Sequence, residues 1–99
     1  MANSVGASGV LLSGSKTVTS AGTAEALAAS GKYSSLVIIA KAANTGQVFV
    51  GGSDVASGTN AGLDSGDSLR LASAKGYVLS DVYLDVSVSG EGVDFYGSN

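Results

Sequence analysis

The chain has 99 residues, of which 44% are apolar and 13% charged, and its formal net charge at pH 7 is −3. This length fits one domain, and the composition differs from the low hydrophobicity and high charge of disordered chains. The five basic residues stand singly along the sequence, which argues against nucleic-acid binding. Cysteine and histidine are absent, which excludes disulfides, thiolate or imidazole metal ligands and the commonest catalytic base.

No apolar run approaches the ~18 residues that a membrane-spanning helix needs. The sequence begins Met1-Ala2-Asn3-Ser4, without the basic region and apolar run of a secretory leader. We therefore expect a soluble protein that has no membrane contact and is not exported through the Sec pathway.

Residues 1–15 are mostly small, with one apolar cluster, Val10-Leu11-Leu12, and we expect them to form an N-terminal arm. A single β domain is expected over residues 16–99, with its first strand at residues 16–20. Residues 23–29 fit either a strand or a short helix. A strand is favoured because a helix this short is not stable unaided.

Residues 33–42 contain Leu36-Val37-Ile38-Ile39, which is apolar on both faces and typical of a central strand. Asn44-Thr45-Gly46 follows, and these residue types predict a hairpin that leads into a strand at residues 47–50. Residues 53–62 are rich in Gly, Ser, Asn and Asp and are expected to form the longest loop.

The second half of the chain shows the clearest alternation. Leu69 and Leu71 are expected to point inward after a turn at residues 65–67. Within residues 77–89 one face of a strand collects Val82, Leu84, Val86 and Val88, and the other collects Asp81, Tyr83, Asp85 and Ser87. After a turn at residues 89–92, Val93 and Phe95 are expected to face inward, and Asp94 and Tyr96 outward.

These segments predict an all-β domain of about seven to eight short antiparallel strands. Short strands at regular spacing with glycine-rich turns are typical of a β-sandwich, a jelly roll or a small barrel. The order of the strands stays open at this point.

Carboxylates are the only plausible catalytic groups. Asp81 and Asp85 would project from one strand face about 13 Å apart, which exceeds the spacing of a glycosidase pair, about 5 to 9.5 Å. A cross-strand residue such as Asp94 could come closer, but we expect these groups to be solvated surface charges. The chain is therefore expected not to be an enzyme, and no catalytic, cofactor-binding or metal-binding residue is assigned.

Two further groups of residues are candidates for binding. Asp54, Asp64 and Asp67 lie in flexible segments that could hold a hard cation, but ordinary turn chemistry explains them equally well. Tyr83 and Tyr96 are expected outward on neighbouring strands, where they could stack a sugar or form a protein interface. The interface is favoured over the sugar platform, and cross-strand packing is the alternative.

A class of small virion proteins of tailed bacteriophages resembles this chain over most of its length beyond residue 15. The resemblance is carried by Lys16-Thr17-Val18-Thr19, Gly22-Thr23-Ala24-Glu25-Ala26-Leu27, residues 37–51 with Asn44-Thr45-Gly46, Leu63, Gly66-Asp67-Ser68-Leu69, Asp81-Val82-Tyr83-Leu84-Asp85 and Gly90-Glu91-Gly92-Val93.

The resemblance implies a structural virion component made in the host cytoplasm. The favoured role is a capsid decoration, or cement, protein that binds the outside of the head lattice, with the major capsid protein as partner. A closed homotrimer is expected for such a small all-β protein. The alternative within the class is a head–tail junction or tail component. A carbohydrate-binding module is the alternative from another class, which a glycan array would distinguish, and a small glycan hydrolase ranks below it.

The assembly interface is expected at Val10, Leu11, Leu12, Tyr83 and Tyr96. In this hypothesis the arm adds to a neighbouring subunit or to the capsid surface, and Leu11 or Leu12 enters an apolar pocket. The alternative is that the segment forms the first strand of its own sandwich.

Overall fold

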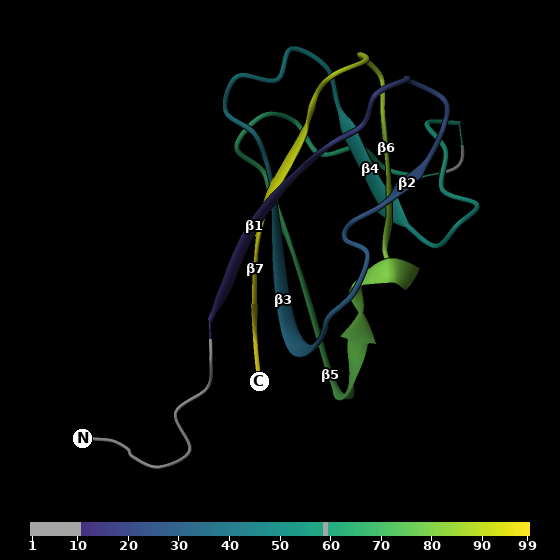
Figure 1. Ribbon diagram of the computed structural model, residues 1–99. Coiled ribbons are helices and arrows are strands. Elements are labelled where there is room, and N and C mark those ends of the chain that lie inside the picture. The colour runs from purple at the N-terminus through teal and green to yellow at the C-terminus, as the bar shows by residue number, and fades with distance from the viewer. Residues whose placement is uncertain (1–10, 59) are drawn as a thin grey trace.

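The computed structural model describes residues 11–58 and 60–99, in which seven strands form two antiparallel sheets packed as a sandwich (Figure 1). The elements are β1 (Leu12–Thr17), β2 (Glu25–Ala26), β3 (Lys32–Ala40), β4 (Val48–Gly51), β5 (Ser68–Val78), the 3-10 turn η1 (Leu79–Asp81), β6 (Tyr83–Val86) and β7 (Gly92–Ser98). The predicted all-β class is confirmed. No helix in the described ranges is long and apolar enough to cross a membrane.

The two sheets have the strand orders β1-β7-β3-β5 and β2-β6-β4, which we call sheet A and sheet B. Successive strands alternate between the sheets along the chain, as in a jelly roll. Leu63 interrupts this alternation, because it follows β4 and pairs by a single bridge with Val48 of that strand. Leu63 thus stands where a fourth strand of sheet B would run, and the domain is a jelly roll with one strand reduced to one residue.

The core lies between the two sheets and is filled by alternate residues of each strand. Leu36, Ile38 and Ala40 of β3 are fully buried, because β3 lies between β7 and β5 in sheet A. Val37 and Ile39 face outward on the same strand and are only half-buried. The other fully or nearly fully buried members of the core cluster are Val18, Leu27, Val48, Leu79, Val82, Leu84, Val86, Val93 and Phe95.

Several sequence-based boundaries are wrong. The first strand begins at Leu12 and pairs with β7 from Leu12↔Gly97 to Thr17↔Gly92, so residues 12–15 belong to sheet A and not to an arm. The segment 23–29 contributes only the two residues of β2, and no helix occurs there. The strand expected over residues 77–89 is interrupted by η1 and ends at Val86, which leaves Val88 40% exposed.

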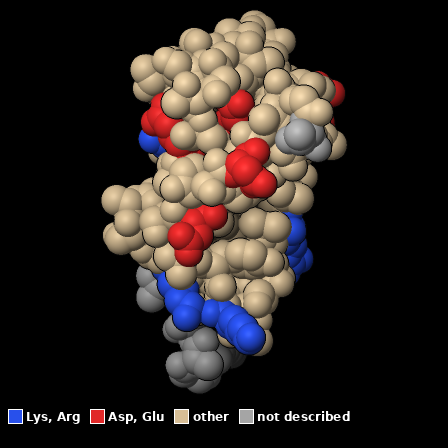
Figure 2. Space-filling view, turned by 90° about the vertical axis from the view of Figure 1, so that its right-hand side faces the viewer, with Lys and Arg blue, Asp and Glu red and all other residues tan. Residues whose placement is uncertain are grey.

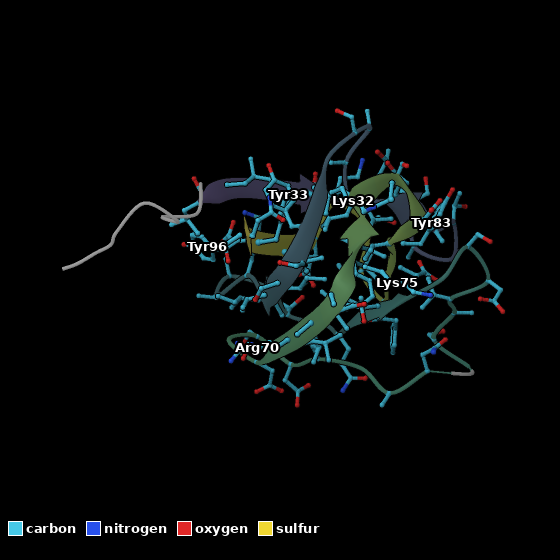
Figure 3. The ribbon with its side chains drawn as sticks, turned by 90° about the horizontal axis from the view of Figure 1, so that it is seen from below. Lys32, Tyr33, Arg70, Lys75, Tyr83 and Tyr96 are labelled. Atoms are coloured by element: carbon cyan, nitrogen blue, oxygen red, sulfur yellow. The ribbon has the colours of Figure 1, made fainter. Side chains whose placement is uncertain are left out.

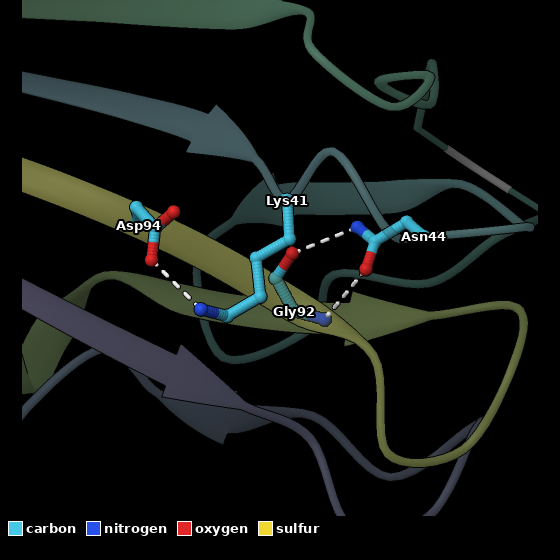
Figure 4. Close-up of polar contacts among 4 residues, drawn as sticks. All are labelled: Lys41, Asn44, Gly92 and Asp94. Carbon is cyan, nitrogen blue, oxygen red and sulfur yellow. Dashed lines mark hydrogen bonds and ion pairs between the residues drawn. The ribbon is translucent and has the colours of Figure 1, made fainter.

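The hairpin expected at Asn44-Thr45-Gly46 is also wrong, because β3 and β4 lie in different sheets. The segment around the turn contacts the start of β7 instead. Asn44 donates from Nδ2 to the Gly92 carbonyl at 2.8 Å and accepts the Gly92 N–H at 3.4 Å (Figure 4). Next to this pair, Lys41 Nζ lies 2.7 Å from Oδ1 of Asp94. The crossover between the sheets is therefore fixed to the start of β7.

Glu91 fixes the same crossover from the other side. Its carboxylate accepts the N–H of Thr45 at 2.7 Å, the Thr45 hydroxyl at 2.8 Å and the N–H of Gly46 at 2.9 Å. The two backbone hydrogen bonds hold the pKa of Glu91 below its ordinary value, since they stabilise the ionised form.

We expect Gly92→Ala to lower the free energy of unfolding by about 1–3 kcal/mol, the range for overpacking. A Cβ at this position would collide with the backbone of Lys16 and Thr17 on β1. Gly58→Ala is the matched control, since nothing lies within 4 Å of a Cβ there. Urea unfolding of both variants measures the difference. Equal midpoints would show that β1 can shift to accommodate the added Cβ without a loss of stability.

The free energy of unfolding should decrease at acid pH, because Glu91 becomes protonated and loses its charge. Because its folded pKa is lowered, its contribution is complete above the ordinary value of 4.5 and is lost as pH falls through the folded pKa. Glu91→Gln should therefore destabilise the domain most at pH 7, and its deficit relative to the unmodified chain should shrink below pH 4.5. Urea unfolding from pH 7 to pH 3 tests this, with Asp54→Asn in the exposed loop as control. Parallel curves for Glu91→Gln and the unmodified chain would contradict it.

Candidate functional site

The two sides of the sandwich are closed to different degrees. On the side of β1 and β2, Lys16 Nζ lies 2.9 Å from Oε1 of Glu25, which ties sheet A to sheet B. The other carboxylate oxygen of Glu25 accepts the N–H of Thr19 at 2.7 Å. The hydrogen bond from the Thr19 N–H has the largest effect on the pKa of Glu25, and the hydrogen bond from Lys16 has the next largest. Both lower this pKa. This side is bridged by polar groups that join the two sheets.

The side of β4 and β5 is open, because four strands of sheet A face three strands of sheet B. Leu69 and Leu71 of β5 point inward as the sequence predicted, but they are only half-buried. Their register partners on β3, Ile38 and Leu36, are fully buried. The difference within each pair arises because no strand of sheet B covers β5.

An apolar cavity of about 270 Å³ lies at this open side. Its walls come from β4, from the inner face of β5 and from the segment around η1. The lining residues are Val50, Gly51, Gly52, Leu69, Leu71, Tyr77, Asp81 and Val82. Asp81 is the one charged residue among them, and it is exposed. The cavity therefore suits an apolar side chain, and we call it, with the edge of β4 beside it, the β4 groove.

The edge of β4 has an open position for another strand. Val48 exchanges both backbone hydrogen bonds with Leu63, at 3.0 and 2.8 Å. Since strand peptides alternate in direction, the N–H and C=O of Val50 face the same edge. Beyond Leu63, no strand or bridge of residues 11–58 and 60–99 pairs with β4 there. A further strand could add at this point.

Charged side chains discourage the pairing of a further strand with β5, and β4 has no such side chains. Arg70 and Lys75 lie on β5 and Lys32 on the adjoining start of β3 (Figure 3), and like charges on an edge strand discourage pairing. The sequence of β4, Val48–Gly51, contains no charged residue. In Figure 2 the main group of Lys and Arg side chains lies at the lower end of the face shown, and most Asp and Glu side chains lie above it. Of the two strands beside the groove, β4 therefore has the edge that can accept a further strand.

The structure does not bring the expected interface residues together. Tyr83 lies in β6 of sheet B and is half-buried, whereas Tyr96 lies in β7 of sheet A and is 42% exposed. Figure 3 shows them well apart, so they do not form one aromatic surface. Leu12 packs against the core from β1, while Leu11, directly before it, is 67% exposed. Val10 lies outside the described residues.

The expected surface carboxylates also differ in their environment. Asp85 is buried, contrary to expectation, because the loop before β2 covers that face of β6. Its Oδ1 accepts the N–H of Gly22 at 2.9 Å and of Val86 at 2.8 Å. Asp81 lies in η1 and not on the strand, so the two carboxylates do not share a strand face. Asp94 is on sheet A and pairs with Lys41.

Asp64 and Asp67 make hydrogen bonds within and beside a turn. Asp67 Oδ2 accepts the N–H of Asp64 at 3.1 Å, and Gln47 Nε2 donates to Asp64 Oδ1 at 3.1 Å. Within the described part of the chain, no three acidic side chains form a group that could hold a metal ion. This finding gives no support to a cation site at Asp54, Asp64 and Asp67.

The residues of the β4 groove were not identified as a site from the sequence. Among them, the sequence predicted Leu69, Leu71 and Val82 to lie on inward faces, which is the ordinary pattern of core residues. Comparisons of the chain with family models, with curated proteins and with solved structures gave no match. The strand order and the single bridge at Leu63 define the class of the domain. It is a small jelly roll with an open strand position beside β4.

The register pair Leu36 and Leu71 tests the open side directly. Leu36→Ala should cost about 2–5 kcal/mol in the free energy of unfolding, as for a buried leucine. Leu71→Ala should cost less than about 2 kcal/mol, since only part of its side chain loses burial in the isolated domain. Urea unfolding at a concentration where the chain is monomeric gives both values. Equal losses would mean that the groove is closed.

Proposed function

We propose that this chain is a non-enzymatic structural protein of a bacteriophage virion, and specifically a capsid decoration protein. In this role it binds the outside of the head lattice as a homotrimer, with the major capsid protein as its partner. The proposal combines the resemblance in sequence with an all-β domain whose open features suit protein contacts.

The β4 groove is the observation that carries the proposal. It joins an apolar cavity of about 270 Å³ to a strand edge without charged residues. An extended polypeptide satisfies both features at once, because its backbone pairs with the edge and its side chains enter the cavity. A small molecule would use the cavity and leave the edge unpaired.

The motifs that carry the resemblance support a shared fold more than a shared site. Asn44-Thr45-Gly46 and Gly90-Glu91-Gly92 lie far apart in sequence, yet they contact each other through Asn44, Glu91 and Gly92. In this chain these residues hold the crossover between the two sheets. Their presence together therefore favours common architecture, which is why the proposal also rests on the groove.

Gold-labelled antibodies against this chain should decorate the heads of intact virions. The purified protein should also co-sediment with empty heads built from the major capsid protein, saturating at a whole number of trimers per three-fold position. Label confined to the neck or tail would replace the proposal with a junction or tail role. Virions without label, and heads that do not bind the protein, would refute it.

A further inference from the structure

We propose that the open strand position beside β4 is filled by the N-terminal segment of a second copy of this chain. The segment adds as a short strand beside Val50 and places an apolar side chain in the cavity. This inference rests on the proposed role in an assembly and names the first partner in it. Its test uses the purified protein alone, so it can fail or succeed independently of binding to heads.

The acceptor side follows from the geometry of the groove. The peptide of Val50 faces the open edge, two residues beyond the Val48–Leu63 bridge. A strand added there continues the position at which Leu63 stands and lies opposite β5. Alternate side chains of that strand point toward Leu69 and Leu71, which nothing in sheet B now covers. The added strand completes sheet B as a four-stranded layer.

The donor side follows from the start of β1. Leu11 is 67% exposed, although it directly precedes a paired strand. Ten residues precede Leu11, and no residue before Lys16 has a charged side chain. Such a segment matches an uncharged edge and an apolar cavity, and Val5, Val10 and Leu11 are its candidates for entry. Extended, ten residues span up to about 33–36 Å, more than the length of β4.

A second copy fits the groove better than the same chain does. β1 and β5 are the opposite edges of sheet A, about 14 Å apart at three strand spacings. To reach its own groove, the segment would have to run across the end of the sandwich, which uses about 14 Å of its reach before pairing begins. Between copies, each chain donates at one edge and accepts at the other. Such head-to-tail contacts give a trimer when the rotation between successive copies is 120°, so that the third copy closes the ring.

Cross-linking between two different variants tests the contact. The chain contains no cysteine, so Val10→Cys in one preparation and Leu71→Cys in a second, size-tagged preparation introduce one thiol each. After mixing and mild oxidation, the disulfide between the two variants should form at least about tenfold faster than in the control, because bound segments have a high effective concentration. The control pairs Val10→Cys with Ser20→Cys, an exposed position near the closed side.

Two further measurements complete the test. Light scattering should show an oligomer for the full chain and a monomer after deletion of residues 2–10, with unchanged near-ultraviolet dichroism of the tyrosines. The double variant Val10→Cys/Leu71→Cys, diluted before oxidation, reports whether the segment reaches its own groove. Equal rates in the target and control pairs, a linkage only within one chain, or an oligomer that survives the deletion would each overturn the proposal.

Discussion

A sheet buries its inner face only where another layer lies against it, and in this domain four strands face three. The consequence is visible along β5, where Leu69 and Leu71 stay half-buried beside partners on β3 that are fully buried. The same mismatch creates the cavity, leaves the edge of β4 open and gives Leu63 its position as the remainder of a strand. The features that support an assembly role therefore follow from one imbalance between the layers, and not from a set of specialised side chains.

The sequence predicted well those features that depend on local alternation. Val93 and Phe95 face inward and Asp94 and Tyr96 face outward as expected, because a strand of an antiparallel sheet exposes one face and buries the other. The same reasoning failed at Asp85. Its carboxylate is covered by a loop more than sixty residues earlier in the chain, which donates the N–H of Gly22. Alternation reports the face on which a residue lies, whereas burial of the outer face depends on distant segments.

The turn at residues 44–46 shows a second limit. Asn-Thr-Gly between two apolar runs has the composition of a hairpin, and nothing local distinguishes it from a crossover between sheets. The distinction comes from Glu91 and Gly92, whose contacts with this turn appear only when the two segments are brought together. The β4 groove was inaccessible to sequence reasoning for a related reason. It depends on how many strands each sheet contains, and that number follows from the topology of the whole domain.

The pairing of β1 with β7 places Leu12 beside Gly97, so sheet A joins segments from nearly opposite ends of the sequence. During synthesis β1 leaves the ribosome long before its partner and must wait unpaired until residues 92–98 emerge. Folding of such long-range sheets is slow, since distant segments have to meet before their contacts contribute. Sheet A can therefore form only after residues 92–98 have left the ribosome. Until β7 emerges, both edges of β1 are unpaired, so β1 is exposed to pairing with the open β4 edge of a neighbouring folded copy.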